Sequence, residues 1–193
     1  MANSSTRLPY GFAALAALLV LLAAWTGRDR FAPVGPGSHA PEFTALAEGG
    51  DEVRLSDHRG EVVLVNIWAT WCLPCLREMP SMQRLWEGVG GDGFQILAVS
   101  VDAGFGQTDT AGRPGGDVWA FADSLGLTFP ILHDPSGDIQ QTYQTTGVPE
   151  SFLVGRDGTI YKKVIGAMEW DHGENRDLIE RLLADESQAA SLK

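Results

Sequence analysis

The most regular feature of the chain is a pair of continuous apolar segments, Val62–Trp68 and Phe94–Val101. Apolar residues, many of them β-branched, occupy neighbouring positions in both, as is typical of strands covered on both faces. Between them, Leu73 to about Trp86 has apolar residues at spacings of three and four, which predicts a helix that Pro80 should kink. Because a helix separates the two strands, we expect them to be parallel neighbours in a βαβ unit.

Glycine-containing turns divide the rest of the pattern. The turns at 49–51 and 155–158 each lie between two strand candidates, so each turn with its two flanking strands predicts a β-hairpin. Outside the βαβ unit we expect strands at Glu42–Leu46, Glu52–Leu55, Phe129–Leu132, Ser151–Val154 and Thr159–Ile165, and helices at Asp117–Leu125, Asp138–Tyr143 and Glu174–Ala184. Asp102–Gly116 is a polar insertion that either contacts partners or is a plain flexible loop. The order of elements predicts an α/β fold with one mixed sheet and helices on both faces.

The N-terminal part has a different pattern, because no residue from Leu8 to Gly27 is charged. Twenty residues at about 1.5 Å rise span roughly 30 Å, the thickness of a bilayer core. Residues 1–27 are therefore expected to be an uncleaved membrane anchor. A cleaved signal peptide and a buried helix are the alternatives, although Trp25 interrupts the small residues that a cleavage site needs. The basic residues on the two sides nearly balance, so they do not decide the orientation.

The remaining domain boundaries follow from composition. Residues 28–40 are rich in proline and glycine and are expected to be a linker, residues 41–186 the globular domain and residues 187–193 a flexible tail. The length of 193 residues suffices for one domain with a short appendage. The net charge of -11 excludes a nucleic-acid partner, since such proteins need a basic surface.

The candidate chemistry lies in the chain's two cysteines, Cys72 and Cys75, at the start of the first predicted helix. A helix start favours negative charge, so Cys72 is expected to be the attacking thiolate. Cys75, one turn further, is expected to resolve the mixed disulfide, and Pro74 stiffens the small ring. No second cysteine pair or spaced histidine pair accompanies them in the sequence, so a structural zinc site is not expected and no metal or other cofactor is required.

Several segments together resemble one family. They are Ala40-Pro41-Glu42-Phe43, Leu64–Cys75, Glu78-Met79-Pro80 and Gly147–Leu153, distributed over about residues 40–184. The chain is similar to the membrane-anchored, thioredoxin-like thiol-disulfide oxidoreductases of the TlpA-like and ResA-like group. This resemblance implies a thioredoxin-like fold with an N-terminal β-hairpin and a central insertion.

The resemblance also implies roles for further residues. The Val148–Pro149 peptide bond is expected to be cis and to present its backbone to a substrate, with Trp71 and Pro74 on the same binding surface. A trans turn proline is the alternative. Glu78 matches a partly buried glutamate of the family that handles the proton of the resolving thiol. The alternative is an exposed glutamate paired with Arg77 or Arg84.

The expected function is an extracytoplasmic protein-disulfide reductase. Asn66 stands where thioredoxin has a buried aspartate, so Asn66 is expected to serve only as a hydrogen-bonding strand residue. The resemblance implies a membrane thiol transporter as electron donor and cytochrome c or copper-oxidase assembly proteins as substrates, with the domain facing the periplasm or the equivalent extracytoplasmic side. A copper-handling module that binds metal through the reduced cysteines is one alternative, and a peroxiredoxin-like peroxidase is another. The Thr70-Trp71-Cys72 sequence does not fit the peroxidase pattern.

Overall fold

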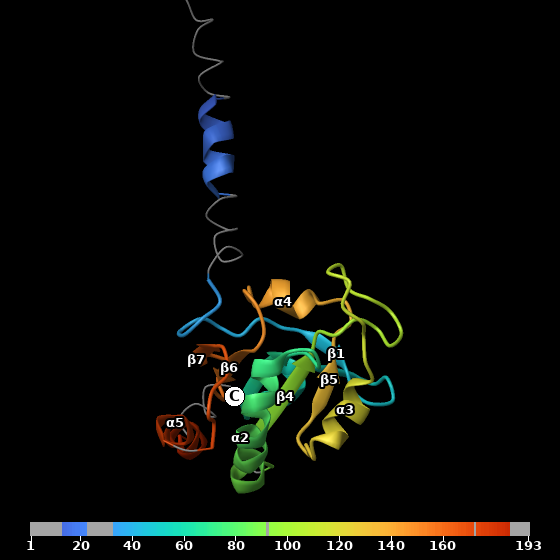
Figure 1. Ribbon diagram of the computed structural model, residues 1–193. Helices are drawn as coiled ribbons and strands as arrows, with labels where there is room; N and C mark the ends of the chain where they lie inside the picture. Colours follow the sequence, from blue (N-terminus) through green and yellow to red (C-terminus); the bar gives the residue numbers. More distant parts are fainter. Residues whose placement is uncertain (1–12, 23–32, 92, 172, 186–193) are drawn as a thin grey trace, which may run out of the picture. The chain divides into compact units, whose positions relative to one another are not determined.

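The computed structural model describes residues 13–22, 33–91, 93–171 and 173–185 (Figure 1). It divides into two compact units, Met1–Pro33 and Val34–Lys193. In the first unit, residues 13–22 form a helix of apolar, exposed residues. No helix within the described ranges is long and apolar enough to cross a membrane. The rest of the expected anchor and the expected tail at 187–193 lie outside the described residues.

Two central strands organise the second unit. β3 (Val62–Trp68) and β4 (Phe94–Ser100) pair in parallel along their whole length, and all residues of β3 are buried. α2 (Leu73–Val89) connects them and continues through Pro80. The predicted βαβ unit is therefore confirmed, because strands that lie between helical layers lose contact with water on both faces.

Five further strands complete a seven-stranded mixed sheet of order β2-β1-β5-β4-β3-β6-β7. They are β1 (Thr44–Leu46), β2 (Glu52–Arg54), β5 (Ile131–His133), β6 (Glu150–Val154) and β7 (Ile160–Ile165). β1 and β2 form the predicted N-terminal hairpin, and β6 and β7 form the predicted C-terminal one. The second predicted strand ends one residue early, since Leu55–His58 forms a 3-10 helix.

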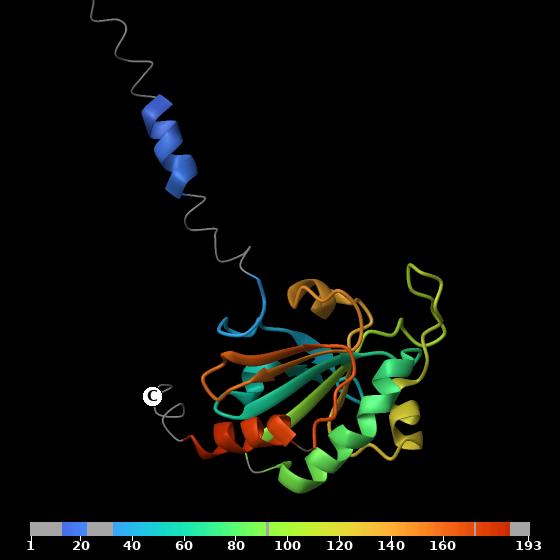
Figure 2. The ribbon, with the colours of Figure 1, turned by 60° about the vertical axis from the view of Figure 1, so that its left-hand side comes forward.

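The helices cover both faces of the sheet, as predicted (Figure 2). The others are α3 (Val118–Ser124), α4 (Asp138–Thr142) and α5 (Gly173–Ala184). α2, α3 and α5 lie on one face, where Trp68 of β3 stacks on Phe121 of α3 at 6.2 Å between ring centroids. α4 lies on the other face, where Tyr143, just after α4, meets Phe152 of β6 at 4.8 Å.

The segment expected to be a linker is bonded to the domain from Val34 onward. Gly37 N–H donates to the Ile160 carbonyl at 2.8 Å, and Ile160 N–H donates to the Ser38 carbonyl at 2.9 Å. These bonds extend the sheet edge at β7 by a short antiparallel stretch. The compact unit accordingly begins at Val34, earlier in the chain than Pro41.

The buried position of β3 generates a stability prediction. We expect Leu64→Ala, at a fully buried position of β3, to lower the free energy of unfolding by about 2–5 kcal/mol, since it leaves a cavity between packed layers. Urea unfolding of the oxidised protein measures this change. Leu125→Ala, the same substitution at an exposed helix end, is the matched control and should cost less than about 0.5–1 kcal/mol. Equal losses for the two variants would contradict the assignment of β3 as the core strand.

Candidate functional site

The two cysteines form a disulfide at the start of α2, with 5.3 Å between their Cα atoms. Cys72 is the N-cap residue, and its Sγ accepts a hydrogen bond from Cys75 N–H at 3.2 Å. Cys72 keeps 4% of its surface exposed whereas Cys75 keeps none. Because an external disulfide can reach only an exposed sulfur, this difference agrees with Cys72 as the attacking residue and Cys75 as the resolving residue.

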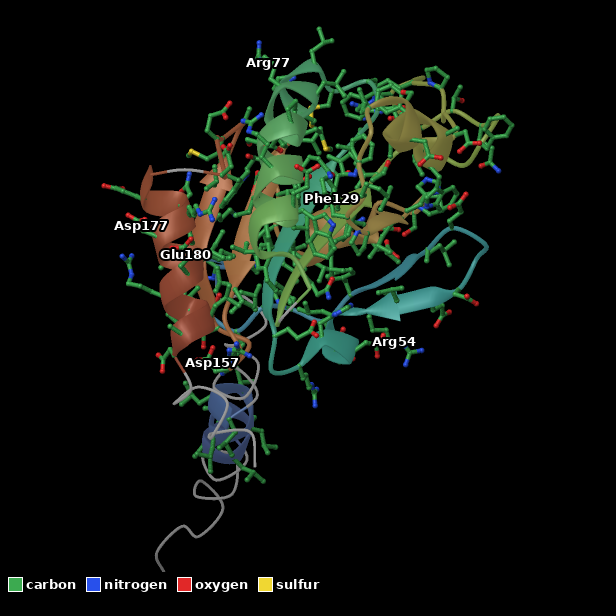
Figure 3. All side chains as sticks on the ribbon, turned by 90° about the horizontal axis from the view of Figure 1, so that it is seen from below. Arg54, Arg77, Phe129, Asp157, Asp177 and Glu180 are labelled. Carbon is green, nitrogen blue, oxygen red and sulfur yellow. A yellow bond between two sulfur atoms is a disulfide. The ribbon has the colours of Figure 1, made fainter. Side chains whose placement is uncertain are left out.

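The surroundings of the disulfide are apolar on the solvent side. Leu73, next to Cys72, is 73% exposed, and Pro74 follows it in the first turn of the helix. That first turn has no acidic residue to oppose a thiolate. Arg77 extends from the same end of α2 into solvent (Figure 3). The free amide groups of this helix end therefore provide the main local stabilisation of negative charge on Cys72.

Glu78 is buried one turn beyond Cys75, with 1% of its surface exposed. Its Oε1 accepts a hydrogen bond from Asn66 Nδ2 at 2.8 Å, and its Oε2 accepts one from Met168 N–H at 3.1 Å. Burial raises the pKa of Glu78 to about 7, and these two bonds together with the Trp170 side chain limit the rise. The Trp170 indole favours the carboxylate by its proximity, although its N–H does not reach hydrogen-bond geometry.

The alternative of an exposed, paired Glu78 does not describe the structure. Arg84 forms its ion pairs with Asp171 and Glu169 on the loop before α5. Arg77 lies on the exposed side of α2. Glu78 instead faces the interior between α2 and the sheet, where a carboxyl group can change protonation near neutral pH.

Asn66 connects three elements of the site. Its Nδ2 group donates to Glu78 on α2 and to Ser151 Oγ on β6 at 2.9 Å. Its Oδ1 is buried and has no hydrogen-bond partner among the residues that the structure describes. Asn66 is a hydrogen-bonding strand residue, as expected, but it also positions the carboxyl group of Glu78. No local pattern signalled this bridge, because Ser151 lies 85 positions away from Asn66.

The Val148–Pro149 peptide bond is cis, as the resemblance implied. Pro149 is buried, Val148 packs against the core, and the Pro149 carbonyl accepts a hydrogen bond from Gly166 N–H at 2.8 Å. Glu150 directly after it pairs with Ile67, near the end of β3 that leads to the cysteine turn. The register therefore brings Pro149 to the same end of the sheet as the disulfide.

Glu150 is a buried acidic residue that the sequence interpretation missed. Its Oε1 accepts hydrogen bonds from Thr146 N–H at 2.6 Å and Thr146 Oγ1 at 2.9 Å, and Lys163 Nζ lies 3.4 Å from Oε2. The loop that precedes the cis peptide bond is held against β6 and β7 by these contacts. A charged residue at the start of an apolar strand was the available signal, but its partners could not be read from the sequence.

The fold and the site define a class: this protein is a thioredoxin-like thiol-disulfide oxidoreductase with a redox-active cysteine pair. The profile of the AhpC/TSA family matches residues 36–163. The chain belongs to the AhpC/TSA family, and its relatives include proteins named ResA, the group that the motifs had indicated.

Relatives and solved structures agree with this assignment. Thiol-disulfide oxidoreductase ResA of Geobacillus kaustophilus is 40% identical over 159 residues, which cover 79% of this chain and 86% of the relative. Thioredoxin-like protein YneN of Bacillus subtilis is 33% identical and is covered to 88%, with 78% of this chain aligned. The crystal structure of a Chlorobium tepidum protein assigned as thiol:disulfide interchange protein DsbE superposes with a TM-score of 0.60 at 30% identity, covering 77% of this chain and 95% of that one.

The buried Glu78 generates a prediction about pH. Because its pKa is raised in the folded protein from 4.5 to about 7, the folded state holds more protons than the unfolded state between these values. Stability is therefore greatest, for this group, below the unfolded pKa and falls as pH rises toward 7. We expect the oxidised protein to lose about 2–3 kcal/mol between pH 5 and pH 8 relative to Glu78→Gln.

Urea unfolding of both proteins at several pH values measures this difference. The comparison isolates Glu78, because all other titrating groups are common to both proteins. A difference that stays constant from pH 5 to pH 8 would show that the carboxyl group has an ordinary pKa.

Proposed function

We propose that this protein is an extracytoplasmic protein-disulfide reductase in which Cys72 attacks the substrate and Cys75 resolves the intermediate. The carrying observation is the arrangement of Cys72 as the N-cap of α2, with a small exposed edge, over a fully buried Cys75 and a buried Glu78. The class of reaction is that named for the relatives and solved structures described above, and the direction and roles are our proposal.

The reaction balances as two exchanges. In the reduced protein, the Cys72 thiolate attacks one sulfur of the substrate disulfide, so that the substrate S–S bond breaks and its second sulfur leaves as a thiolate. Cys75 then loses its proton and attacks Cys72, which releases the first substrate sulfur and forms the Cys72–Cys75 disulfide. Two electrons pass from the protein to the substrate, and an external dithiol must restore the reduced pair.

Glu78 is placed to take the proton of Cys75. The two residues are three positions apart on α2, a spacing that puts side chains on one helix face, and both are buried. A base with a pKa near 7 can accept and return a proton at neutral pH. Asn66 and the Met168 amide hold the carboxyl group in place.

The charges around the pair support the proposed direction of the reaction. A strong dithiol oxidant stabilises its reduced thiolate, commonly through nearby positive charge. Here Arg77 is exposed and the nearest buried ionisable group on α2 is an acid. The helix start is the main feature that favours the thiolate, and this supports a reductant such as thioredoxin rather than a strong oxidant.

Location and partners belong to the same proposal. The uncharged stretch of residues 8–27 favours a single membrane anchor in the inner or cytoplasmic membrane. The family resemblance favours the extracytoplasmic side for the domain. The resemblance favours a membrane thiol transporter as electron donor and assembly proteins of cytochrome c or copper oxidase as substrates.

Peroxide reduction is the second candidate, because the matching family is AhpC/TSA. In that reaction Cys72 attacks hydrogen peroxide to give a sulfenic acid and water, and condensation with Cys75 gives the disulfide and a second water. We favour protein-disulfide reduction because the similar proteins described above are named thiol-disulfide oxidoreductase and thiol:disulfide interchange protein.

Trapping tests the roles of the cysteines. Cys75→Ser removes the resolving thiol, so we expect Cys72 to accumulate as a mixed disulfide with its substrate in cells. Non-reducing electrophoresis and mass spectrometry detect and identify the adduct. Cys72→Ser is the matched control and should trap nothing. A sulfenic acid on Cys72 without protein adducts would favour the peroxidase, and exclusively cytosolic partners would overturn the proposed location.

The reduction potential tests the direction. We expect a value near that of thioredoxin, about -270 mV, because little positive charge stabilises the reduced pair. Equilibration with dithiothreitol buffers, followed by alkylation of free thiols, measures it. A value near -120 mV, that of a strong oxidant, would exclude the reductase and leave the exchange chemistry in place.

A further inference from the structure

The insertion between β4 and α3, residues 102–116, is an ordered hairpin at the end of the sheet where α2 begins (Figure 2). Thr108 and Pro114 form a β-bridge, and Asp109 N–H donates to the Arg113 carbonyl at 2.9 Å. The Asp109 side chain binds the tip, since its Oδ1 accepts hydrogen bonds from the amides of Ala111 and Arg113 at 2.8 Å each. The segment therefore has a hydrogen-bonded structure of its own.

Asp102, the first residue of the insertion, holds the turn before Cys72 through buried hydrogen bonds. Asp102 is fully buried, and its carboxylate accepts hydrogen bonds from Thr70 N–H at 2.8 Å and from Thr70 Oγ1 at 2.6 Å. Ser100 Oγ supplies a third donor at 2.6 Å. A buried carboxylate with three donors fixes its partners firmly, because losing any of them would leave charge without compensation. Thr70 is thereby fixed two positions before Cys72.

Arg113, near the other end of the insertion, stacks on the same turn. The guanidinium carbon of Arg113 lies 3.7 Å from the ring centroid of Trp71, the residue directly before Cys72. Asp109 Oδ2 accepts a hydrogen bond from Arg113 Nε at 2.6 Å and so keeps the guanidinium group over the ring. Hydrogen bonds from Arg113 lower the pKa of Asp109, and the bond from the Arg113 backbone amide contributes most. The Asp109 carboxylate therefore stays ionised beside the guanidinium group.

A shallow groove of about 290 Å³ lies between the insertion and this turn. It is lined mainly by apolar atoms, from Thr70, Trp71, residues 114–117 and Phe121. Trp71 forms one wall of the groove and the insertion forms the other, so the position of Trp71 sets its width. A protein substrate whose disulfide reaches Cys72 must place its neighbouring residues on this surface, whereas a small disulfide needs only the sulfur.

We propose that residues 102–116 are a positioning element for Trp71, and that Arg113 thereby determines how well a protein disulfide, rather than a small one, binds beside Cys72. The groove would hold an apolar side chain next to the substrate cysteine. This inference rests on the proposed exchange reaction of Cys72 and adds to it a substrate-selecting wall.

Steady-state kinetics with two substrates test the proposal. Insulin serves as the protein disulfide with dithiothreitol as reductant, and oxidised glutathione serves as the small disulfide with the prereduced protein. We expect Arg113→Ala to raise KM for insulin about two- to fivefold, the range for an exposed cation–π contact, with kcat unchanged. The rate constant with oxidised glutathione should remain unchanged. Arg113→Lys should resemble Arg113→Ala, because lysine lacks the planar group that stacks.

A matched control separates this effect from a loss of surface charge. Arg54 is an exposed arginine that pairs with Glu52 on β2, and Arg54→Ala should leave both reactions unchanged. Asp109→Asn provides a second variant that keeps the acceptor for the two tip amides and weakens the pairing with Arg113. It should raise KM for insulin in the same direction, by a smaller factor.

The indole N–H resonance of Trp71 gives a reading that does not depend on activity. Six tryptophans are present, so Trp71→Phe identifies the signal. We expect Arg113→Ala to shift this resonance and Arg54→Ala to leave it in place. An unmoved resonance, or equal effects on insulin and oxidised glutathione, would overturn the inference. A wild-type protein that reduces neither substrate would instead overturn the proposed function, and the resonance would still test the positioning of Trp71.

Discussion

The burial of β3 on both faces is the constraint on which the site depends. This strand lies between β4 and β6 inside the sheet, and the turn that follows it leads directly to Cys72. Because β3 cannot shift without exposing apolar side chains, the start of α2 is fixed relative to the sheet. The same strand carries Asn66, which reaches Glu78 on α2 and Ser151 on β6. β3 is therefore both the buried core strand and the strand that positions the site residues.

Two opposite electrostatic environments lie within the first two turns of α2. The helix start favours the anionic form of Cys72, because its free amide groups and dipole act on the first turn. One turn beyond Cys75, desolvation favours the neutral form of Glu78, whose pKa rises from 4.5 to about 7. That rise corresponds to about 3 kcal/mol of preference for the neutral form. In the proposed reaction, Cys72 at the helix start and the buried acid Glu78 divide nucleophilic attack and proton transfer between them.

The surface around the disulfide combines segments that are distant in the chain. The cis Val148–Pro149 bond lies at the start of β6, and the Glu150 carboxylate fastens the loop before it. On the other side, Asp102 and Arg113 hold the turn of Thr70 and Trp71. Trp71 is therefore a side chain held by its neighbours rather than a mobile surface residue, which is the condition for a binding surface of defined shape.

The sequence by itself determined the sheet, its βαβ centre, both hairpins and the cysteine pair at a helix start, because these depend on local periodicity and on residues a few positions apart. Family motifs added the cis proline and the buried Glu78. Only the tertiary structure decided how Glu78 is held, since Met168 lies 90 positions away from it. It likewise decided that residues 102–116 fold back onto Trp71, and that Glu150 is buried beside Lys163. Hydrogen bonds and stacking between distant residues exist only once the layers have packed, and no local pattern of polar and apolar residues records them.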